Sequence, residues 1–392
     1  MLPIRHPMRI LALEPWYGGS HRTFLDGLAA NSRHQVDTIT MSARFWKWRM
    51  HGGAVTMARK AERMYAEGEK PDLIFASSMV NLPAFLALTR FELEGVPVVM
   101  YMHENQLTYP LPEGRERDHT YGYINYLSCL AADHVVFNSQ FHYDQFVEAL
   151  PRLLRLFPDY THLKTAAQIR EKSSVLHLGL DLRGHDTYAS AYEGHDWGPG
   201  MKPPIVLWNQ RWEYDKDPEA FFRVMNRLDD SGHTFRLILA GEHFEEQPKE
   251  FERAFERYAE RILHYGYAED FREYSRLLHR ADLVVSTSKH EFFGISMLEA
   301  IYCGCHPLLP NRLSYPELIP ESLQSPLLHA PVLYDSEDEL FEIMARILKG
   351  EERPLPPNTL RGICEHLEWG RHVSHFDNLF EEIARKRGHV RL

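Results

Sequence analysis

Short apolar runs alternate with longer amphipathic stretches along this chain, and no other feature limits its fold so strongly. In the first half, the runs typical of strands are 9–13, 72–76, 96–102 and 134–137, and the stretches typical of helices are 20–30, 83–91, 120–131 and 140–150. Parallel strands need long crossover connections, which helices usually provide. The order therefore predicts a parallel α/β domain of the Rossmann-like kind.

The second half of the chain repeats this alternation. Its predicted strands are 205–208, 235–240, 283–286 and 306–309, and its predicted helices are one that begins after Asp217, then 251–264, 294–302 and 369–386. Residues 184–204 are rich in Gly, Asp, His and Pro, which is typical of a linker. We therefore predict an α/β protein with two Rossmann-like domains, 1–183 and 205–365, that face each other across a cleft. A C-terminal helix within 366–392 can pack back on the first domain.

Composition excludes several other classes of protein. At about 150 residues per domain, a chain of 392 residues suits two or three domains. Hydrophobic residues make up 44% of the sequence and no apolar run is long enough for a membrane span, so we expect no membrane partner. Four cysteines form no disulfide framework, so we expect a reduced, cytoplasmic protein. The formal charge of −11 excludes a uniformly basic surface for nucleic acid but permits a local basic patch.

Ligands of such sheets bind at the carboxyl ends of strands, so the turns that follow the strands are the first candidates for a site. Gly18 and Gly19 lie where the first strand meets the first helix. Glycines let the backbone approach a ligand, and a helix start favours an anion such as phosphate. A plain tight turn explains the pair equally well. The full Gly-x-Gly-x-x-Gly pattern is absent, which disfavours a dinucleotide site.

Arg211 and Lys216 flank the loop that follows the first strand of the second domain. A guanidinium and an ammonium beside a helix start could grip a diphosphate, although a solvated loop would have the same composition. Asp215 and Asp217 match the Asp-x-Asp pattern of metal-dependent sugar transferases. We discount a metal there because Lys216 stands between the two carboxylates and Asp217 already caps a helix.

The segment 288–300 carries the sharpest signal, since a strand ends there, Gly294 lets the chain turn and a helix begins. Glu291 and Glu299 are too far apart to flank a single glycosidic bond, as glycosidase carboxylates do. We expect them to hold the two ends of one extended ligand, with the amides of residues 293–295 meeting the phosphates between. Ordinary helix-entry acids remain the alternative.

A family resemblance now becomes visible. The Glu-x7-Glu spacing, with Arg-x4-Lys earlier in the same domain, resembles the donor half of retaining family 4 glycosyltransferases of the GT-B fold. Six segments together resemble the tRNA-queuosine α-mannosyltransferases: EPWYGGSH at 14–21, FWKWR at 45–49, MHENQL at 102–107, WEYDKDP at 212–218, KHEFFG at 289–294 and EAIYCGC at 299–305.

The resemblance implies transfer of a hexose, mannose from GDP-mannose in particular, onto queuosine in a tRNA anticodon loop. It implies a catalytic role for Glu291, which holds a hydroxyl of the transferred sugar, and for His103, beside the reacting sugar. The implied donor-binding residues are Gly18, Gly19, Arg211, Lys216, Tyr267, Phe293, Gly294, Ile295 and Glu299. Glu299 would hold the ribose, and Tyr267 lies where the nucleobase packs. No metal and no cofactor are expected, because cations and helix starts stabilise the departing diphosphate.

Cations and aromatic side chains interleave tightly only at 44–49, where an RNA base could stack on an indole between phosphate-binding cations. The predicted acceptor-binding residues are His21, Arg44, Trp46, Lys47, Trp48, Arg49, Asn105 and Gln106. Alternatively, both tryptophans belong to the core or to a cleft wall. A lipid, glycan or small-molecule acceptor is the second hypothesis, and a nucleotide-sugar-binding protein without turnover is the third. The sequence leaves open which hexose, which base and which tRNA are used.

Overall fold

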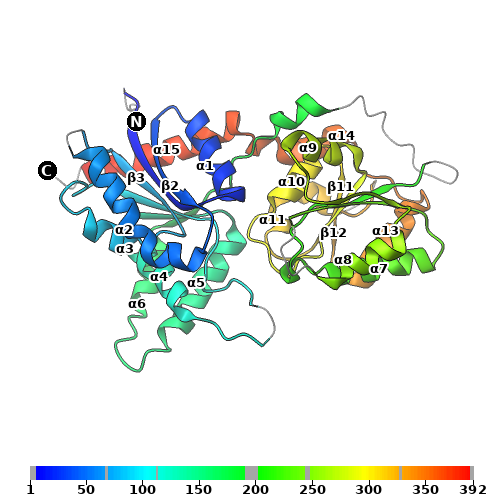
Figure 1. Cartoon of the computed structure of the whole chain (residues 1–392), viewed down its shortest axis with the longest axis horizontal. Helices are drawn as coiled ribbons and strands as arrows, with labels where there is room; N and C mark the ends of the chain where they lie inside the picture. Colours follow the sequence, from blue (N-terminus) through cyan, green and yellow to red (C-terminus); the bar gives the residue numbers. More distant parts are fainter. Residues whose placement is uncertain are drawn as a thin grey trace. The chain divides into compact units, whose positions relative to one another are not determined.

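The computed structural model describes residues 6–66, 69–111, 114–189, 202–242, 248–325 and 329–388. The chain forms two compact units, one made of 1–180 with 369–392 and the other of 181–368 (Figure 1). Most of the predicted linker, from 190 to 201, lies outside the described residues. Its first residues lie in the 3-10 helix Arg183–Tyr188, where the ring of His185 packs against Phe271 inside the second unit.

The first unit is built on a parallel six-stranded sheet with the order β2-β1-β3-β4-β5-β6. Its strands are β1 (Arg9–Tyr17), β2 (Gln35–Ser42), β3 (Leu73–Ser77), β4 (Val98–Met102), β5 (His134–Phe137) and β6 (Ser173–Val175). All four strands predicted in this half are present. The sequence did not reveal β2, because an edge strand exposes polar residues along much of its length and so shows no apolar run.

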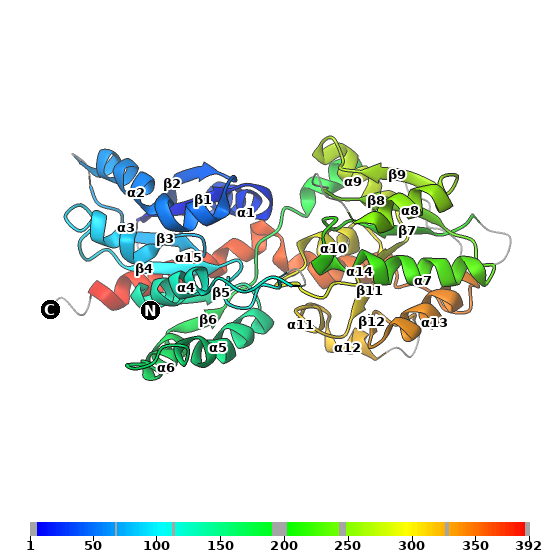
Figure 2. The same ribbon diagram turned by 60° about the horizontal axis from the view of Figure 1, so that its bottom comes forward.

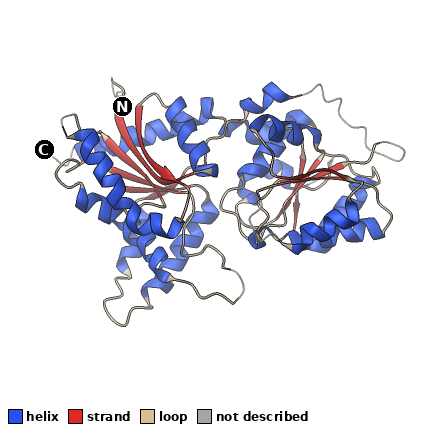
Figure 3. Cartoon of the chain, in the orientation of Figure 1, coloured by secondary structure: helices blue, strands red, loops and turns tan. Residues whose placement is uncertain are grey.

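Helices cover both faces of this sheet (Figures 2 and 3). They are α1 (Gly19–Asn31), α2 (Trp46–Tyr65), α3 (Leu82–Leu88), α4 (His119–Ala131), α5 (Gln140–Leu154), α6 (Lys164–Glu171) and α15 (Trp369–Gly388). Leu11 and Ile74 face a core that includes residues of α2, α3 and α5. The neighbouring Phe75 points to the opposite face, where its ring meets those of Phe24 in α1 and Phe380 in α15.

The C-terminal helix α15 is fixed to this unit by Trp369, whose indole leaves no room for a side chain at Gly27. A Cβ at Gly27 would lie 2.0 Å from the indole Nε1. We therefore expect Gly27→Ala to lower the free energy of unfolding by about 1–3 kcal/mol through overpacking, measured by urea denaturation. Gly370→Ala on α15 is the control, because nothing lies within 4 Å of the position that its new methyl group would take, and alanine favours a helix. Equal stability of the Gly27 variant and the control would contradict this prediction.

The second unit has its own parallel six-stranded sheet, in the order β12-β11-β10-β7-β8-β9. The strands are β7 (Ile205–Trp208), β8 (Arg236–Ala240), β9 (Ile262–Gly266), β10 (Leu283–Val285), β11 (His306–Pro310) and β12 (Leu333–Tyr334). The helices are α7 (Pro218–Asp230), α8 (Lys249–Tyr258), α9 (Phe271–Arg280), α10 (Ile295–Tyr302), α11 (Tyr315–Leu318), α12 (Glu321–Gln324), α13 (Glu337–Leu348) and α14 (Pro357–Cys364).

One prediction in this unit is wrong. The expected helix 251–264 ends at Tyr258, and its last residues form part of the edge strand β9. A half-buried edge strand lacks the continuous apolar run of a central strand, so the sequence did not separate the two elements.

Within the described residues, no helix is long and apolar enough to cross a membrane, and the four cysteines carry free thiols.

Candidate functional site

Two loops meet at the carboxyl ends of β7 and β10 in the second unit. The backbone N–H of Lys289 donates to the carbonyl of Asp215 at 2.9 Å, and the hydroxyl of Thr287 donates to the carbonyl of Lys216 at 3.0 Å. Asp217 caps α7 as predicted, by accepting from the N–H of Ala220. These bonds fix the loop that carries Arg211 and Lys216 against the loop that carries Glu291.

Lys216 is the buried cation of this site, with a side chain only 8% exposed. Its Nζ lies 3.1 Å from Glu291 Oε2, 3.3 Å from Asp215 Oδ2 and 3.0 Å from the carbonyl oxygen of His290. Burial would lower the pKa of Lys216, but the two carboxylates outweigh burial and raise it. Burial likewise would raise the pKa of Glu291, and Lys216 outweighs it so that the pKa is lowered. Both groups are therefore charged at neutral pH.

The start of α10 lies beside this ion pair. Gly294 precedes the helix with φ of +104°, a backbone conformation that glycine adopts without strain. No side chain caps the helix, so the N–H groups of Ile295 and Ser296 can serve an anion, whereas those of Met297 and Leu298 already donate to the carbonyl of Gly294. Glu291 Oε1 also accepts a bond of 3.4 Å from the N–H of Phe293, whose ring is buried.

Glu299 lies within α10 and accepts a hydrogen bond of 2.8 Å from the hydroxyl of Tyr274 in α9. Burial raises the pKa of Glu299 to about 7. Tyr274 in turn accepts from Asn209 Nδ2 at 3.3 Å. Sequence reasoning missed Tyr274 because nothing in the α9 sequence distinguishes it from a core tyrosine. Tyr267, by contrast, is 67% exposed and follows Gly266 at the end of β9.

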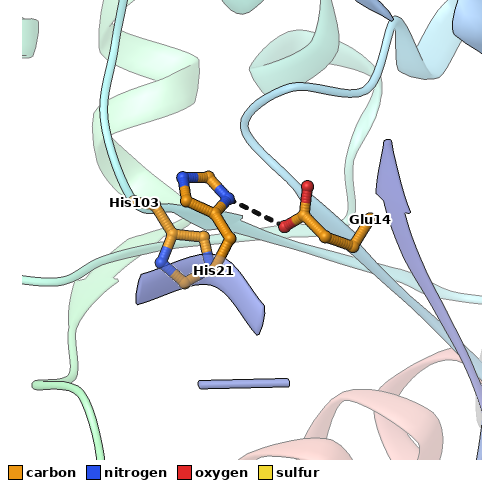
Figure 4. A group of neighbouring side chains, drawn as sticks. All are labelled: Glu14, His21 and His103. Atoms are coloured by element: carbon orange, nitrogen blue, oxygen red, sulfur yellow. Dashed lines mark hydrogen bonds and ion pairs between the residues drawn. The ribbon is translucent and has the colours of Figure 1, made fainter. Parts of the chain in front are cut away.

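In the first unit, Glu14, His21 and His103 come together from β1, α1 and the loop after β4 (Figure 4). His21 Nδ1 lies 2.9 Å from Glu14 Oε2, and the two imidazole rings lie 4.3 Å apart between centroids. Burial would lower the pKa of His21, but Glu14 outweighs it and raises the pKa. Burial, with smaller contributions from His21 and His142, holds the pKa of His103 well below its usual value. His103 is therefore neutral at pH 7.

This group also offers the donor atoms of a possible metal site, since a carboxylate oxygen and two imidazole nitrogens lie within 4.8 Å of one another. Such a donor set would suit a transition metal. The two ring planes are inclined by 37°, with their centroids 4.3 Å apart. The contact between His21 and Glu14, with the neutral His103 beside it, accounts for this group without a metal ion.

Gly18 and Gly19 are glycines for different structural reasons. Gly18 has extended backbone, and a Cβ there would lie 2.5 Å from the Cβ of Ala43, so packing alone requires a glycine. Gly19 has φ of +49°, with nothing within 4 Å of its Cβ position. No side chain caps α1 at this point. Of the pair, Gly19 offers a ligand open space beside a helix start.

The two tryptophans of the predicted acceptor segment, at the start of α2, differ in their exposure to solvent. Trp46 is half-buried, and its ring packs 4.9 Å from that of Tyr121. Trp48 is 65% exposed and Phe45 is 77% exposed. Phe45 also has φ of +55°, a strained conformation of a kind that concentrates at functional sites. Trp46 is therefore partly packed against the unit, whereas Trp48 is open to solvent.

The remaining predicted acceptor residues have mixed surroundings. Arg44 and Lys47 are exposed, whereas Arg49 donates from Nε to the carbonyl of Ser42 at 3.1 Å. Asn105 is buried and accepts from the N–H groups of Leu107 and Thr108, so it shapes the loop after β4. Gln106 donates from Nε2 to Glu104 Oε1 at 3.1 Å. Gln106 and Glu104 are half-buried and remain open to a ligand.

Two family models match most of the chain. Residues 9–180 match the family described as tRNA-queuosine alpha-mannosyltransferase N-terminal, and residues 195–354 match Glycosyl transferases group 1. The chain is 35% identical over 314 residues to the tRNA-queuosine alpha-mannosyltransferase of Drosophila melanogaster, covering 80% of this chain and 82% of that protein.

Solved structures share the fold at low identity. HepE of Anabaena, solved in complex with UDP and glucose, superposes with a TM-score of 0.61 at 15% identity, over 96% of this chain and 98% of that one. An E. coli trehalose-6-phosphate protein bound with UDP-2-fluoro glucose gives a TM-score of 0.66 at 12% identity, over 95% and 99%. The prediction of a GT-B fold with two Rossmann-like domains is confirmed.

Proposed function

Because this chain belongs to the tRNA-queuosine α-mannosyltransferase family, we propose that it transfers mannose from GDP-mannose onto queuosine in tRNA. It is a glycosyltransferase. The observation that carries the proposal is the buried Lys216–Glu291 pair beside the uncapped start of α10. A cation and a helix start together suit the diphosphate of a sugar nucleotide.

The second unit binds the donor in this proposal. Lys216, Arg211 and the first amides of α10 hold the diphosphate. Glu291, ionised and bound by Lys216, accepts a hydrogen bond from a hydroxyl of the mannose. Glu299 accepts hydrogen bonds from the ribose hydroxyls, and the exposed Tyr267 lies beside the base. No metal is required, since these cations and amides stabilise the departing diphosphate.

The proposed reaction keeps the configuration at the sugar carbon. The bond from that carbon to the diphosphate oxygen breaks, and a bond to the queuosine hydroxyl oxygen forms on the same face. The hydroxyl proton passes to the departing phosphate oxygen, so no enzymic nucleophile is needed. A covalent mannosyl adduct on Glu291, sought by mass spectrometry of the denatured enzyme, would overturn this route.

Donor binding should depend on pH through Glu299. Its carboxyl, with a pKa of about 7, is mostly protonated below that pH, and its O–H then donates where the two ribose hydroxyls need an acceptor. We expect the KM for the sugar nucleotide to rise about tenfold between pH 8 and pH 6, with kcat much less affected. Steady-state kinetics across this range measures the effect. Glu299→Gln should have a high KM that no longer changes with pH; an unchanged pH profile in this variant would contradict the assignment.

On the acceptor side, Trp48 is expected to stack on an RNA base. Stacking is worth about 1–3 kcal/mol per base, so Trp48→Ala should raise the KM for tRNA about tenfold and leave the KM for the donor unchanged. Phe91→Ala is the matched control, because Phe91 is a 72% exposed aromatic residue of the same unit outside this segment. Equal KM values for tRNA in the two variants would refute a stacking role.

The proposed function is tested by incubating the protein with queuosine-containing tRNA and a panel of nucleotide sugars. The digested nucleosides are then weighed. A hexose increment on queuosine with GDP-mannose, abolished by ribonuclease pretreatment, is the expected result. A hexose increment with a different nucleotide sugar would mean that the donor carries another sugar or another base than proposed. Consumption of no donor in the presence of modified tRNA would favour a binding protein without turnover.

A further inference from the structure

A groove lies between the edge strand β2 and the C-terminal half of α2 in the first unit. Its volume is about 280 Å³ and its lining residues are Thr38, Ile39, Thr40, Lys60, Arg63 and Met64. Two hydroxyls and two cations give the groove the donors that bind phosphate oxygens, without a carboxylate in its lining. None of these residues belongs to the donor or acceptor residues assigned above.

The cations of this groove lack acidic partners. Lys60 donates from Nζ to the carbonyl of Thr40 at 2.8 Å, and Arg63 donates from Nε to the carbonyl of Arg59 at 3.2 Å. Over the described ranges, no ion pair joins Lys60, Arg63 or Arg59 to a carboxylate, whereas Arg9 of the neighbouring strand is paired with Asp37. In a chain of net charge −11, such unpaired cations on one helix face are complementary to an external polyanion.

The groove continues the acceptor segment along one helix. At about 1.5 Å per residue, Arg63 lies roughly 22 Å along α2 from Trp48. A nucleotide stacked on Trp48 cannot itself reach that far, but the base-paired stem that carries its loop can. We infer that this groove binds the phosphate backbone of the stem that closes the anticodon loop, an inference that rests on the proposed function.

A simpler role for Lys60 would be protection of the free edge of β2, since lysines commonly guard sheet edges. The two roles predict different results for RNA binding. Guarding an edge affects aggregation and stability and leaves RNA affinity unchanged. Binding the stem backbone changes RNA affinity and its salt dependence.

The test uses the full-length double variant Lys60→Gln with Arg63→Gln and measures RNA binding by fluorescence anisotropy without any sugar donor. One RNA is the queuosine-containing stem-loop and the other is the loop sequence alone. We expect affinity for the stem-loop to fall about tenfold or more and the slope of log K against log salt to become shallower by about 1.5, as expected from two lost phosphate contacts. Affinity for the loop alone should stay within twofold.

Arg152→Gln with Arg170→Gln is the matched control, since these exposed cations lie on α5 and α6 of the same unit. Its binding should equal that of the wild type. Unchanged stem-loop affinity in the groove variant, or an equal loss for both RNAs, would overturn the inference. If the wild type binds the stem-loop through this groove but adds no hexose, the proposed function fails while the groove assignment stands.

Discussion

Replacing Lys216 by methionine is expected to lower kcat about 10²–10³-fold, one of the two largest effects expected for this enzyme. Lys216 is the buried cation nearest to Glu291, and charge builds on the departing diphosphate in the transition state. Removal of one preorganised group that stabilises such charge costs a factor of this size. Single-turnover measurement with saturating donor and tRNA separates the chemical step from binding.

The same substitution also leaves two carboxylates without their cation. Glu291 and Asp215 both lie near Lys216 Nζ, and removal of one partner from a buried ion pair costs about 3–5 kcal/mol. We therefore expect the Lys216 variant to unfold at lower urea concentration, and activity must be measured under conditions where it is folded.

Lys289→Met provides the control for this lysine. Lys289 also pairs with an aspartate, Asp217 at 3.0 Å, in the same pair of loops, but its side chain is 60% exposed. An exposed pair contributes little, so this variant should keep kcat within about threefold and its stability within about 1 kcal/mol. If the two lysine variants showed equal kcat, Lys216 would not act on the reacting diphosphate.

The parts of this site that the sequence predicted are those with local signals. Asp217 and Pro218 mark the start of α7, and Gly294 marks the start of α10, because caps and positive φ act within a few residues. Lys216 and Glu291 follow the carboxyl ends of β7 and β10, which lie at one edge of the sheet. Their proximity can therefore be predicted from the order of the strands alone.

The contacts that tune the site could not be predicted in the same way. Tyr274 reaches Glu299 from a different helix, and the pKa of Glu299 depends on burial, which no local pattern reveals. Glu14 and His21 share one sequence motif, yet their 2.9 Å contact depends on the turn between β1 and α1. The sequence also left the roles of Trp46 and Trp48 open, and helix α2 separates them by facing one inward and one outward.

His103→Phe should lower kcat about 10²-fold at pH 7 while the KM values for donor and tRNA change little. A neutral His103 can form a hydrogen bond to the reacting sugar, and loss of one preorganised group of this kind costs about 10²–10³-fold. Phenylalanine keeps the ring contacts with His21, Phe24 and Tyr101, so the fold should persist. The pKa of His103 is well below 6.5, so His103 should stay neutral between pH 6 and pH 8. It should therefore cause no change of rate with pH in this range.

The control for this substitution is His134→Phe, at the start of β5, away from the carboxyl ends of the strands. His134 is half-buried and lies 2.8 Å from Ser174 through Nε2, so this variant also loses one imidazole hydrogen bond. We expect it to lose stability by about 0.5–1.5 kcal/mol and to keep kcat. Single-turnover rates of the two variants at pH 7 decide the role of His103. A rate for His103→Phe within about threefold of the wild type would show that the imidazole does not touch the reacting sugar, and the group of Glu14, His21 and His103 would then serve only to hold β1, α1 and the loop after β4 together.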